Sequence, residues 1–352
     1  MTGRVVVVGG GITGLAAAHH LVTVSPELEV LVLEATDRTG GKLRWGRVGP
    51  LVVDAGADGF LARQPEMAEL VREIGLGDEL VAPATGQAYI WARDALRPIP
   101  TPSVLGVPLD PDTVAATGIV GAEAVVELRR RLRADLAPLE GDATIGSVLR
   151  PRLGDEVFDM LVDPLLGGIN AGAGDQMSIE ASALQLADAA RAGGSFAVAL
   201  RGGVSDAAAA AGGPVFLGVR GGTGRVVESL RAELGPCVRL SSPVARVASG
   251  GSSWLVTARG GDVSADAVIL TTPAPVTSRL LAPLAPAAAD LIGAIELADA
   301  VLVTFVLPAG GIDHPLDGSG FLVPRATGLL MTACSWSSSK WEHYHDGVHT
   351  VL

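Results

Sequence analysis

Residues 4–42 read RVVVVGGGITGLAAAHHLVTVSPELEVLVLEATDRTGGK and contain the pattern that decides the fold. Four valines run directly into a glycine-rich turn, as a buried parallel strand does before a dinucleotide-binding helix. The turn consists of Gly9, Gly10, Gly11, Ile12, Thr13 and Gly14. The Ala-rich stretch 15–22 is predicted to be a helix, and its N-terminal N–H groups and positive dipole end suit a pyrophosphate. We therefore expect the turn to hold the phosphates of a dinucleotide.

A second apolar run, 30–33, ends at Glu34, where an acid can hold a ribose hydroxyl. Its negative charge disfavours a 2′-phosphate, so FAD or NAD is expected rather than NADP. An isolated G-x-G-x-x-G is weak evidence, because 46 of the 352 residues are glycine. The order strand, turn, helix, strand and acid is much more specific, and it predicts a Rossmann-like α/β domain.

Composition limits the functions open to the chain. Its net charge is −12 and no basic run occurs, which argues against nucleic acid as a partner. No basic leader and no uninterrupted run of about 18 apolar residues is present, so we expect a cytoplasmic protein with at most peripheral membrane contact. Cys237 and Cys334 fit a reducing compartment. His343, His345 and His349 lie in a stretch that we expect to be frayed, and we predict no metal site there.

The length allows two domains. The residue pattern near 113–192 predicts helices. Strand patterns resume at 215–219, and a buried strand is predicted at 267–270. We assign residues 1–85 and 215–274 to the dinucleotide-binding domain, and residues 86–214 and 275–352 to an inserted α+β substrate domain. Residues 161–172, LVDPLLGGINAG, lack a polar period and are expected to form an apolar turn segment.

Several segments, in their order along the whole chain, resemble the oxygen-dependent porphyrinogen oxidases, and among them the coproporphyrinogen III oxidases of Gram-positive bacteria. GGGITGLAAAHHL is shared by many flavoproteins, whereas PLLGGINAG and TACSWSSSKW are far more specific. Further segments are GADGFLARQPEMAELVREIGLGDELV, ATGQAYIW, LRPIPTPSVLGVP and GGTGRVVESL. The resemblance implies FAD as the cofactor and a p-hydroxybenzoate-hydroxylase-like topology with an inserted substrate domain.

The resemblance also implies a reaction in haem biosynthesis. Coproporphyrinogen III would be oxidised to coproporphyrin III by molecular oxygen, with release of hydrogen peroxide. Flavin N5 would take a hydride from a meso carbon, so no side chain is needed as a catalytic acid or base. The partners would be the porphyrinogen, oxygen and other haem-pathway enzymes. Protoporphyrinogen IX oxidase is an alternative, and a truncated, non-catalytic flavin-binding remnant is another.

The resemblance carries roles to individual positions. Arg38 to Lys42 resembles the R-x-G-G-R segment of amine-oxidase-like flavoproteins, with Lys42 in place of the second arginine. The residues expected to approach the flavin are Lys42, Gly56, Ala57, Asp58 and Gly59. Val244 would offer its backbone to the adenine, although an ordinary core valine is the alternative.

Two residues are candidate substrate contacts. Arg97 could bind a propionate, because a guanidinium grips a carboxylate through two hydrogen bonds, although an exposed surface arginine is the alternative. Asn170 stands where the family usually has tyrosine. The sequence stops at 350–352, inside a predicted strand, whereas the family continues with a segment that closes the flavin site. We therefore expect this chain alone to bind FAD weakly.

Overall fold

The computed structural model describes residues 3–211 and 213–352 and divides into two compact units. The first unit holds residues 1–82, as far as they are described, together with Val215–Leu297 and Leu302–Thr304. The second unit holds Pro83–Pro214, Ala298–Val301 and Phe305–Leu352. The assignment of these units to cofactor and substrate is a proposal that we develop below.

A four-stranded parallel sheet forms the centre of the first unit. Its strands run in the order β14 (Val238–Arg239), β2 (Glu29–Leu33), β1 (Arg4–Val8) and β18 (Ala267–Leu270). Strand β1 is apolar at every position from Val5 to Val8, because both faces of the sheet are covered. Val7 packs in a core with α1 and α11, whereas Val6 and Val8 pack in a second core on the opposite face. This arrangement confirms the predicted Rossmann-like α/β domain.

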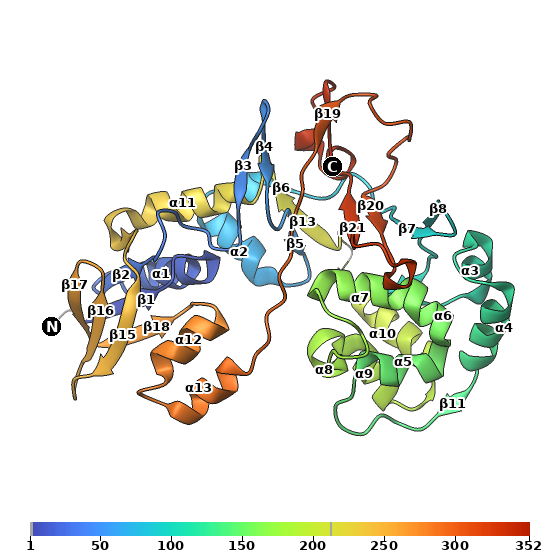
Figure 1. Cartoon of the computed structure of the whole chain (residues 1–352), viewed down its shortest axis with the longest axis horizontal. Coiled ribbons are helices and arrows are strands. Elements are labelled where there is room, and N and C mark those ends of the chain that lie inside the picture. Colours follow the sequence, from blue (N-terminus) through green and yellow to red (C-terminus); the bar gives the residue numbers. More distant parts are fainter. Residues whose placement is uncertain (1–2, 212) are drawn as a thin grey trace. The chain divides into compact units, whose positions relative to one another are not determined.

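The helix-covered face carries α1 (Ile12–Val24) and α11 (Gly224–Leu234), which lie against each other (Figure 1). Shorter elements of the same unit lead away from the sheet. They are β3 (Trp45–Val48), β4 (Leu51–Asp54), β5 (Phe60–Leu61), α2 (Pro65–Glu73), η1 (Gly77–Glu79), β6 (Leu80–Val81), β13 (Phe216–Val219) and η3 (Gly235–Cys237). Strands β3 and β4 form the hairpin expected around Gly49 and Pro50.

The opposite face carries an antiparallel sheet of β15 (Val244–Ser249), β16 (Trp254–Ala258) and β17 (Gly261–Ala265). Two helices follow β18, namely α12 (Ala274–Leu281) and α13 (Pro286–Gly293). Leu280 of α12 is buried in the same core as Val6 and Val8. Residues 275–297 therefore group with the first unit, whereas the sequence predicted that residues from 275 onward belong to the substrate domain.

The second unit combines a small sheet with a group of helices. The sheet has the order β21 (Ala333–Ser335), β20 (Gly320–Leu322), β7 (Tyr89–Ala92) and β8 (Ala95–Pro98). The main helices are α3 (Pro111–Thr117), α4 (Ala122–Arg131), α5 (Ile145–Leu153), α7 (Asp163–Asn170), α8 (Ile179–Ser182), α9 (Leu184–Arg191) and α10 (Phe196–Ala211). The helices between 111 and 191 agree with the helical texture expected near 113–192.

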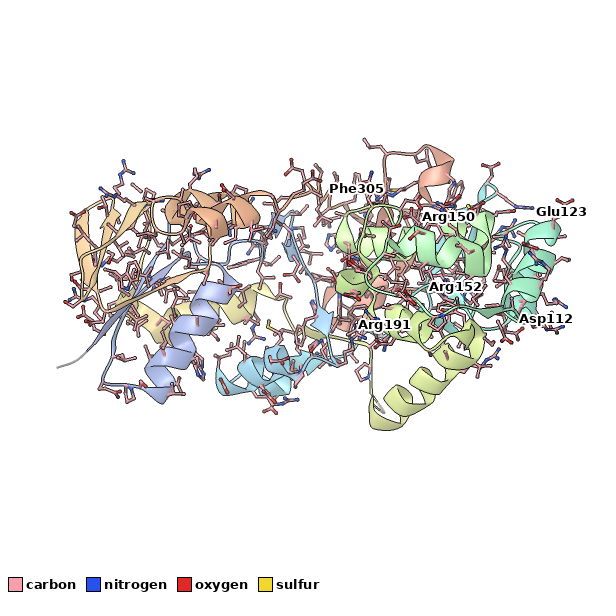
Figure 2. The ribbon with its side chains drawn as sticks, turned by 90° about the horizontal axis from the view of Figure 1, so that it is seen from below. Asp112, Glu123, Arg150, Arg152, Arg191 and Phe305 are labelled. Atoms are coloured by element: carbon pink, nitrogen blue, oxygen red, sulfur yellow. The ribbon has the colours of Figure 1, made fainter. Side chains whose placement is uncertain are left out.

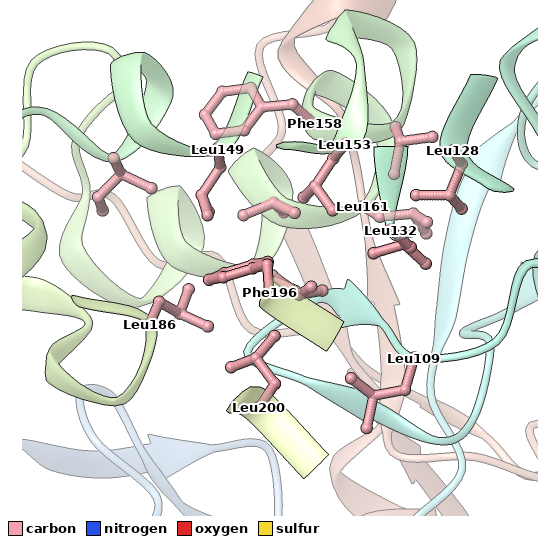
Figure 3. Close-up of a cluster of buried hydrophobic side chains, with 14 of the residues drawn as sticks. Leu109, Leu128, Leu132, Leu149, Leu153, Phe158, Leu161, Leu186, Phe196 and Leu200 are labelled. Carbon is pink, nitrogen blue, oxygen red and sulfur yellow. The ribbon is translucent and has the colours of Figure 1, made fainter. Parts of the chain in front are cut away.

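Short elements complete the second unit. They are β9 (Ser103–Val104), β10 (Val107–Pro108), β11 (Asp135–Leu136), α6 (Asp155–Val157), η2 (Phe158–Val162), β12 (Gly194–Ser195), β19 (Val306–Pro308), η4 (Arg325–Thr327), α14 (Ser337–Lys340), η5 (Glu342–Tyr344) and β22 (His349–Val351). One continuous core joins the helices, with Phe158 and Phe196 among the buried leucines that surround them (Figure 3). The unit therefore has a hydrophobic core of its own.

Residues 161–170 of this segment are helical and only 171–172 form a turn, so the expectation of an apolar turn over 161–172 is wrong. A five-residue π-helix, η2, continues directly into α7. Pro164 stands at the junction of η2 and α7, and because proline has no N–H it cannot donate a hydrogen bond to the preceding turn. The segment lacks a polar period because Leu161, Val162 and Leu166 are buried on several sides.

Among the residues that the structure describes, no helix has both the length and the apolar character needed to cross a bilayer.

Candidate functional site

The glycine-rich turn lies at the carboxyl end of β1 and adopts a conformation that requires small residues. Gly9 has φ +112°, and its N–H donates to Leu33 O at 2.9 Å. A Cβ added at Gly14 would lie 1.9 Å from Gly9 O, so any side chain there would displace α1 from β1. Ile12 packs against the core shared by α1 and α11, and Thr13 is exposed. The turn therefore fixes where the N-terminus of α1 points.

Gly11 supplies the open space that a phosphate needs. Gly11 is the N-cap of α1, and its carbonyl oxygen accepts the Leu15 N–H at 3.0 Å. A Cβ built on Gly11 would have Gly41 Cα, at 3.7 Å, as its nearest neighbour. The first N–H groups of a helix have no intrahelical acceptor, and they carry the positive end of its dipole. The space at Gly11 is open enough for a phosphate group, and the predicted pyrophosphate contact of the turn stays a prediction.

Glu34 follows the last residue of β2 and faces the same turn. Its Oε2 accepts the Gly10 N–H at 2.7 Å, and its Oε1 accepts the N–H and the hydroxyl of Thr36, both at 2.8 Å. The carboxylate is thus held by two backbone amides and the Thr36 hydroxyl, and Oε2, which accepts only one of these hydrogen bonds, keeps a lone pair that can accept a ribose hydroxyl. A Cβ added at Gly10 would lie 2.8 Å from Glu34 Cβ, so the turn and the acid are in direct contact.

The second glycine pair is packed against the first turn. Gly40 N–H donates to Gly10 O at 2.9 Å, and Gly40 forms a parallel bridge with Gly11. Arg38 fastens this loop, because its guanidinium donates to Thr39 O at 3.1 Å and to Gly41 O at 2.9 Å. Lys42 is exposed just beyond the loop. Residues 38–42 are therefore brought to the predicted dinucleotide site.

The run from Gly56 to Gly59 forms the connection between β4 and β5. A Cβ added at Gly56 would lie 2.5 Å from Lys42 O, so this connection touches the segment that carries Lys42. Ala57 O accepts the Thr223 hydroxyl at 2.8 Å. Asp58 and Gly59 are half-buried and lead into β5. The structure thus joins Lys42 to Gly56, two positions expected on the flavin side of the cofactor.

A buried carboxylate that the sequence did not single out fixes this connection. Asp54 accepts the Thr223 N–H at 3.1 Å and the Thr223 hydroxyl at 3.0 Å, and the residue is only 9% exposed. Thr223 follows two glycines with positive φ and precedes α11. The sequence signal that could have identified Thr223 is a hydroxyl residue placed between a pair of glycines and a helix.

A second missed residue is Thr271, directly after β18. Its hydroxyl lies 3.0 Å from Val8 O and 3.1 Å from Gly9 O, so it braces the turn at the end of β1. Polar residues at the carboxyl ends of parallel strands gather at one edge of the sheet, and this rule could have identified Thr271.

Val244 opens β15 close to the ribose acid. Two residues earlier, Ser242 N–H donates to Glu34 O at 2.8 Å, and Ser241 N–H donates to Thr36 O at 2.7 Å. The pairing of β15 with β16 shifts register between Val244 and Arg246. The side chain of Val244 is half-buried and packs with Val8 and Leu33. The adenine contact of Val244 stays a prediction.

The two candidate substrate residues lie in the second unit. Arg97 in β8 is half-buried, and its guanidinium donates to Ala92 O and Thr117 O, each at 3.2 Å. It is therefore not an exposed surface arginine, and two of its five N–H donors serve the backbone. Asn170 ends α7, is exposed, and donates from Nδ2 to Leu166 O at 2.9 Å. Their contacts with substrate stay predictions.

Within the described ranges, no group of three or more His, Cys, Asp or Glu side chains is placed to hold a metal ion.

Comparison with known proteins identifies the family of the chain. Residues 12–352 match the family described as flavin-containing amine oxidoreductases. The chain is 30% identical to the coproporphyrinogen III oxidase of Bacillus subtilis over 359 residues, which are 99% of this chain and 76% of that enzyme. It is 34% identical to the coproporphyrinogen III oxidase of Mycobacterium leprae, over 95% of this chain and 73% of that enzyme.

The fold is also found among solved structures. A candidate protoporphyrinogen oxidase from Exiguobacterium superposes with a TM-score of 0.84 at 32% identity, over 100% of this chain and 76% of that one. The family match spans residues 12–352, which include most of the first unit and all of the second. The chain therefore belongs to the flavin-containing amine oxidoreductase family and is an oxidoreductase with a flavin cofactor.

Proposed function

We propose that the protein uses FAD to oxidise coproporphyrinogen III to coproporphyrin III, with molecular oxygen as the electron acceptor and hydrogen peroxide as the second product. The observation that carries this proposal is the 28–34% identity to three bacterial coproporphyrinogen III oxidases over at least 95% of the chain. FAD is favoured over a mononucleotide because the cradle at Gly11 and the acid at Glu34 suit a pyrophosphate and a ribose.

The flavin supplies the two-electron oxidation when it is bound. The protein contributes binding and orientation. The N-terminus of α1 offers N–H groups to the pyrophosphate, Glu34 accepts from the ribose, and the loops at Gly41 and Gly56 lie beside the cradle. Val244 would offer its backbone to the adenine. In the second unit, Arg97 has N–H groups left for a propionate, and Asn170 is exposed at the end of α7.

The proposal is tested with the purified chain supplied with FAD. Coproporphyrinogen III and protoporphyrinogen IX, both reduced chemically and kept under argon, are added separately to air-saturated buffer. Porphyrin fluorescence and hydrogen peroxide are then followed together. We expect faster oxidation of coproporphyrinogen, with one peroxide formed for each pair of hydrogens removed. Absence of porphyrin formation above the rate without enzyme would contradict the proposal.

Protoporphyrinogen IX oxidation is the second candidate. It is favoured by the likeness to the Exiguobacterium structure, which covers this chain completely. The two substrates differ in the number of propionates, so the same assay separates the candidates. A larger kcat/KM for protoporphyrinogen would replace the first proposal with the second.

A further inference from the structure

A buried carboxylate and a half-exposed guanidinium join two segments of the second unit. Asp163 opens α7 and its side chain is 9% exposed, whereas Arg325 opens η4 and its side chain is 49% exposed. Arg325 Nε lies 3.3 Å from Asp163 Oδ2. A buried carboxylate needs partners, because its desolvation would otherwise cost several kcal/mol.

The remaining contacts of the pair hold the loop that follows α7. Asp163 Oδ1 accepts the Gly174 N–H at 2.7 Å, and Arg325 Nη2 donates to Gly172 O at 2.6 Å. Ala171 follows the last residue of α7 and lies in the left-handed region, with φ +51°. The carboxylate at the start of the helix and the guanidinium of a distant segment therefore determine the path of residues 170–174. Asn170 is the first residue of that path.

The same guanidinium fastens a hairpin that carries exposed apolar side chains. Strands β20 and β21 continue beyond their ladder through the Val323 N–H, which donates to Thr332 O at 2.9 Å. The tip of the hairpin carries Leu329, Leu330 and Met331, which are 53%, 99% and 46% exposed. On α7, Ile169 is 62% exposed. Helix α7 and strand β20 approach each other at Gly168, where an added Cβ would lie 3.8 Å from Leu322 Cδ2.

The exposed apolar side chains of these two segments, which approach each other at Gly168 and Leu322, suit an apolar ligand. Their setting indicates the occupant. The surface is apolar, and its rim carries the half-exposed guanidinium of Arg325 and the amide of Asn170. This combination suits a flat apolar ring with carboxylates at its edge, because guanidinium and amide N–H groups bind carboxylate oxygens.

We propose that Asp163 and Arg325 are positioning residues that hold α7 and the 323–332 hairpin in the arrangement that receives the tetrapyrrole. This inference rests on the proposed function. Asp163 acts through Arg325 and the Gly174 amide, and it does not need to touch the substrate. Loss of either member of the pair leaves Ile169, Leu330 and Met331 in the chain but removes their fixed spacing.

The test compares Asp163→Asn, Arg325→Gln and the double variant. We measure KM and kcat for coproporphyrinogen III, the flavin content, and the Kd of the product coproporphyrin III from its fluorescence. Each single change should raise KM and Kd about tenfold while kcat and flavin content stay near the wild-type values. The double variant should be no worse than the weaker single variant, because both changes remove one coupled interaction.

Matched controls distinguish positioning from a general loss of charge. Asp112 and Arg129 form a second carboxylate–guanidinium pair in the same unit, 76% and 47% exposed, between α3 and α4. Asp112→Asn and Arg129→Gln should leave KM and Kd unchanged. Arg325→Lys should restore binding only in part, because one ammonium cannot span both Asp163 and Gly172 as the guanidinium does.

Unchanged KM and Kd in well-folded Asp163→Asn and Arg325→Gln would overturn the inference, and so would an equal change in the controls. If Arg325→Gln does not fold, Arg325→Lys and Asp163→Asn decide by the same comparison. If the wild-type chain oxidises no porphyrinogen, the proposed function fails, but the Kd for coproporphyrin III still tests the positioning role of Asp163 and Arg325. Weaker coproporphyrin binding in the variants then supports the positioning role, whereas equal or absent binding in all chains overturns it.

Discussion

Gly11 lies inside the predicted cofactor site, and the fold leaves room for a side chain at this position. An added Cβ would have its nearest neighbour, Gly41 Cα, at 3.7 Å, which is ordinary van der Waals contact. Gly11→Val should therefore fold, yet its branched side chain would occupy the space offered to the pyrophosphate. We expect the Kd for FAD to rise at least about tenfold, a loss of about 1.4 kcal/mol of binding. Flavin titration measures this, and circular dichroism reports the fold.

Gly46→Val is the matched control for that change. An added Cβ at Gly46 meets nothing within 4 Å, and the residue lies in β3, where valine is favourable. Flavin affinity should be unchanged in this variant. Normal flavin affinity in Gly11→Val would show that the turn does not hold the phosphates.

Cys334 should be a slow nucleophile. Burial raises the pKa of its thiol above the ordinary value of 9.0, so little thiolate exists at neutral pH. We expect iodoacetamide to label Cys334 slowly at pH 7 and faster as the pH rises beyond 9, and mass spectrometry of the tryptic peptide measures the rate. The urea-unfolded chain is the control and should react faster at every pH below 9. Equal rates in the folded and unfolded chains would show that burial does not suppress this thiol.

Arg150 joins helix α5 to the elements that follow it. Its guanidinium binds Asp175 at 2.8 and 2.9 Å, Asp159 at 2.7 Å and Asp155 at 3.1 Å, and it lies over the Phe158 ring at 4.3 Å. Figure 2 shows Arg150 within the helical part of the second unit. Arg150→Gln should lower the free energy of unfolding by about 1–3 kcal/mol, because three carboxylates lose their shared partner. Thermal unfolding monitored by circular dichroism measures the loss.

The same contact implies a pH dependence. Hydrogen bonding to Arg150 lowers the pKa of Asp175 below 3.8, so the folded state favours the ionised carboxylate. Its stabilising contribution is present above about pH 4 and is lost as the pH falls through the lowered pKa. The wild-type chain should lose stability more steeply than Arg150→Gln as the pH falls below about 4. Arg133→Gln, which removes an exposed arginine of the same unit, should keep the wild-type profile, and parallel profiles for all three chains would contradict this explanation.

At the scale of elements, the sequence predicted best where a local pattern has one physical explanation. Strand β1, the glycine turn and β2 were predictable because alternating burial on two faces requires an unbroken apolar run. Helix α7 was missed because its eight residues include Pro164 and two glycines, which are poor helix formers, and because its first five residues are buried or half-buried without a polar face. Asp54 and Thr223 were missed because their contact joins residues that are 169 positions apart, and no local pattern reports such a pair.

At the scale of the whole molecule, the two units have separate cores. Leu128 is fully buried in the core of the second unit. The predicted cofactor residues all belong to the first unit, which has two cores of its own. Leu128→Ala should destabilise the second unit by about 2–5 kcal/mol through the cavity that it leaves. The Kd for FAD should stay unchanged at 20 °C, because no cofactor contact is altered. A proportionate loss of flavin affinity would show that the units do not behave separately.

Strand β1 pairs with β2 on one side, only 25 positions along the chain, but with β18 on the other side, 262 positions away. A ribosome adds about 5–20 residues per second, so β1 waits on the order of tens of seconds for its second neighbour. Throughout that time its outer edge exposes unpaired N–H and C=O groups and a row of valines. An exposed apolar edge of this kind invites pairing with other chains. The nascent protein should therefore be most vulnerable to aggregation before residue 270 leaves the ribosome, and cofactor capture should come only after that point.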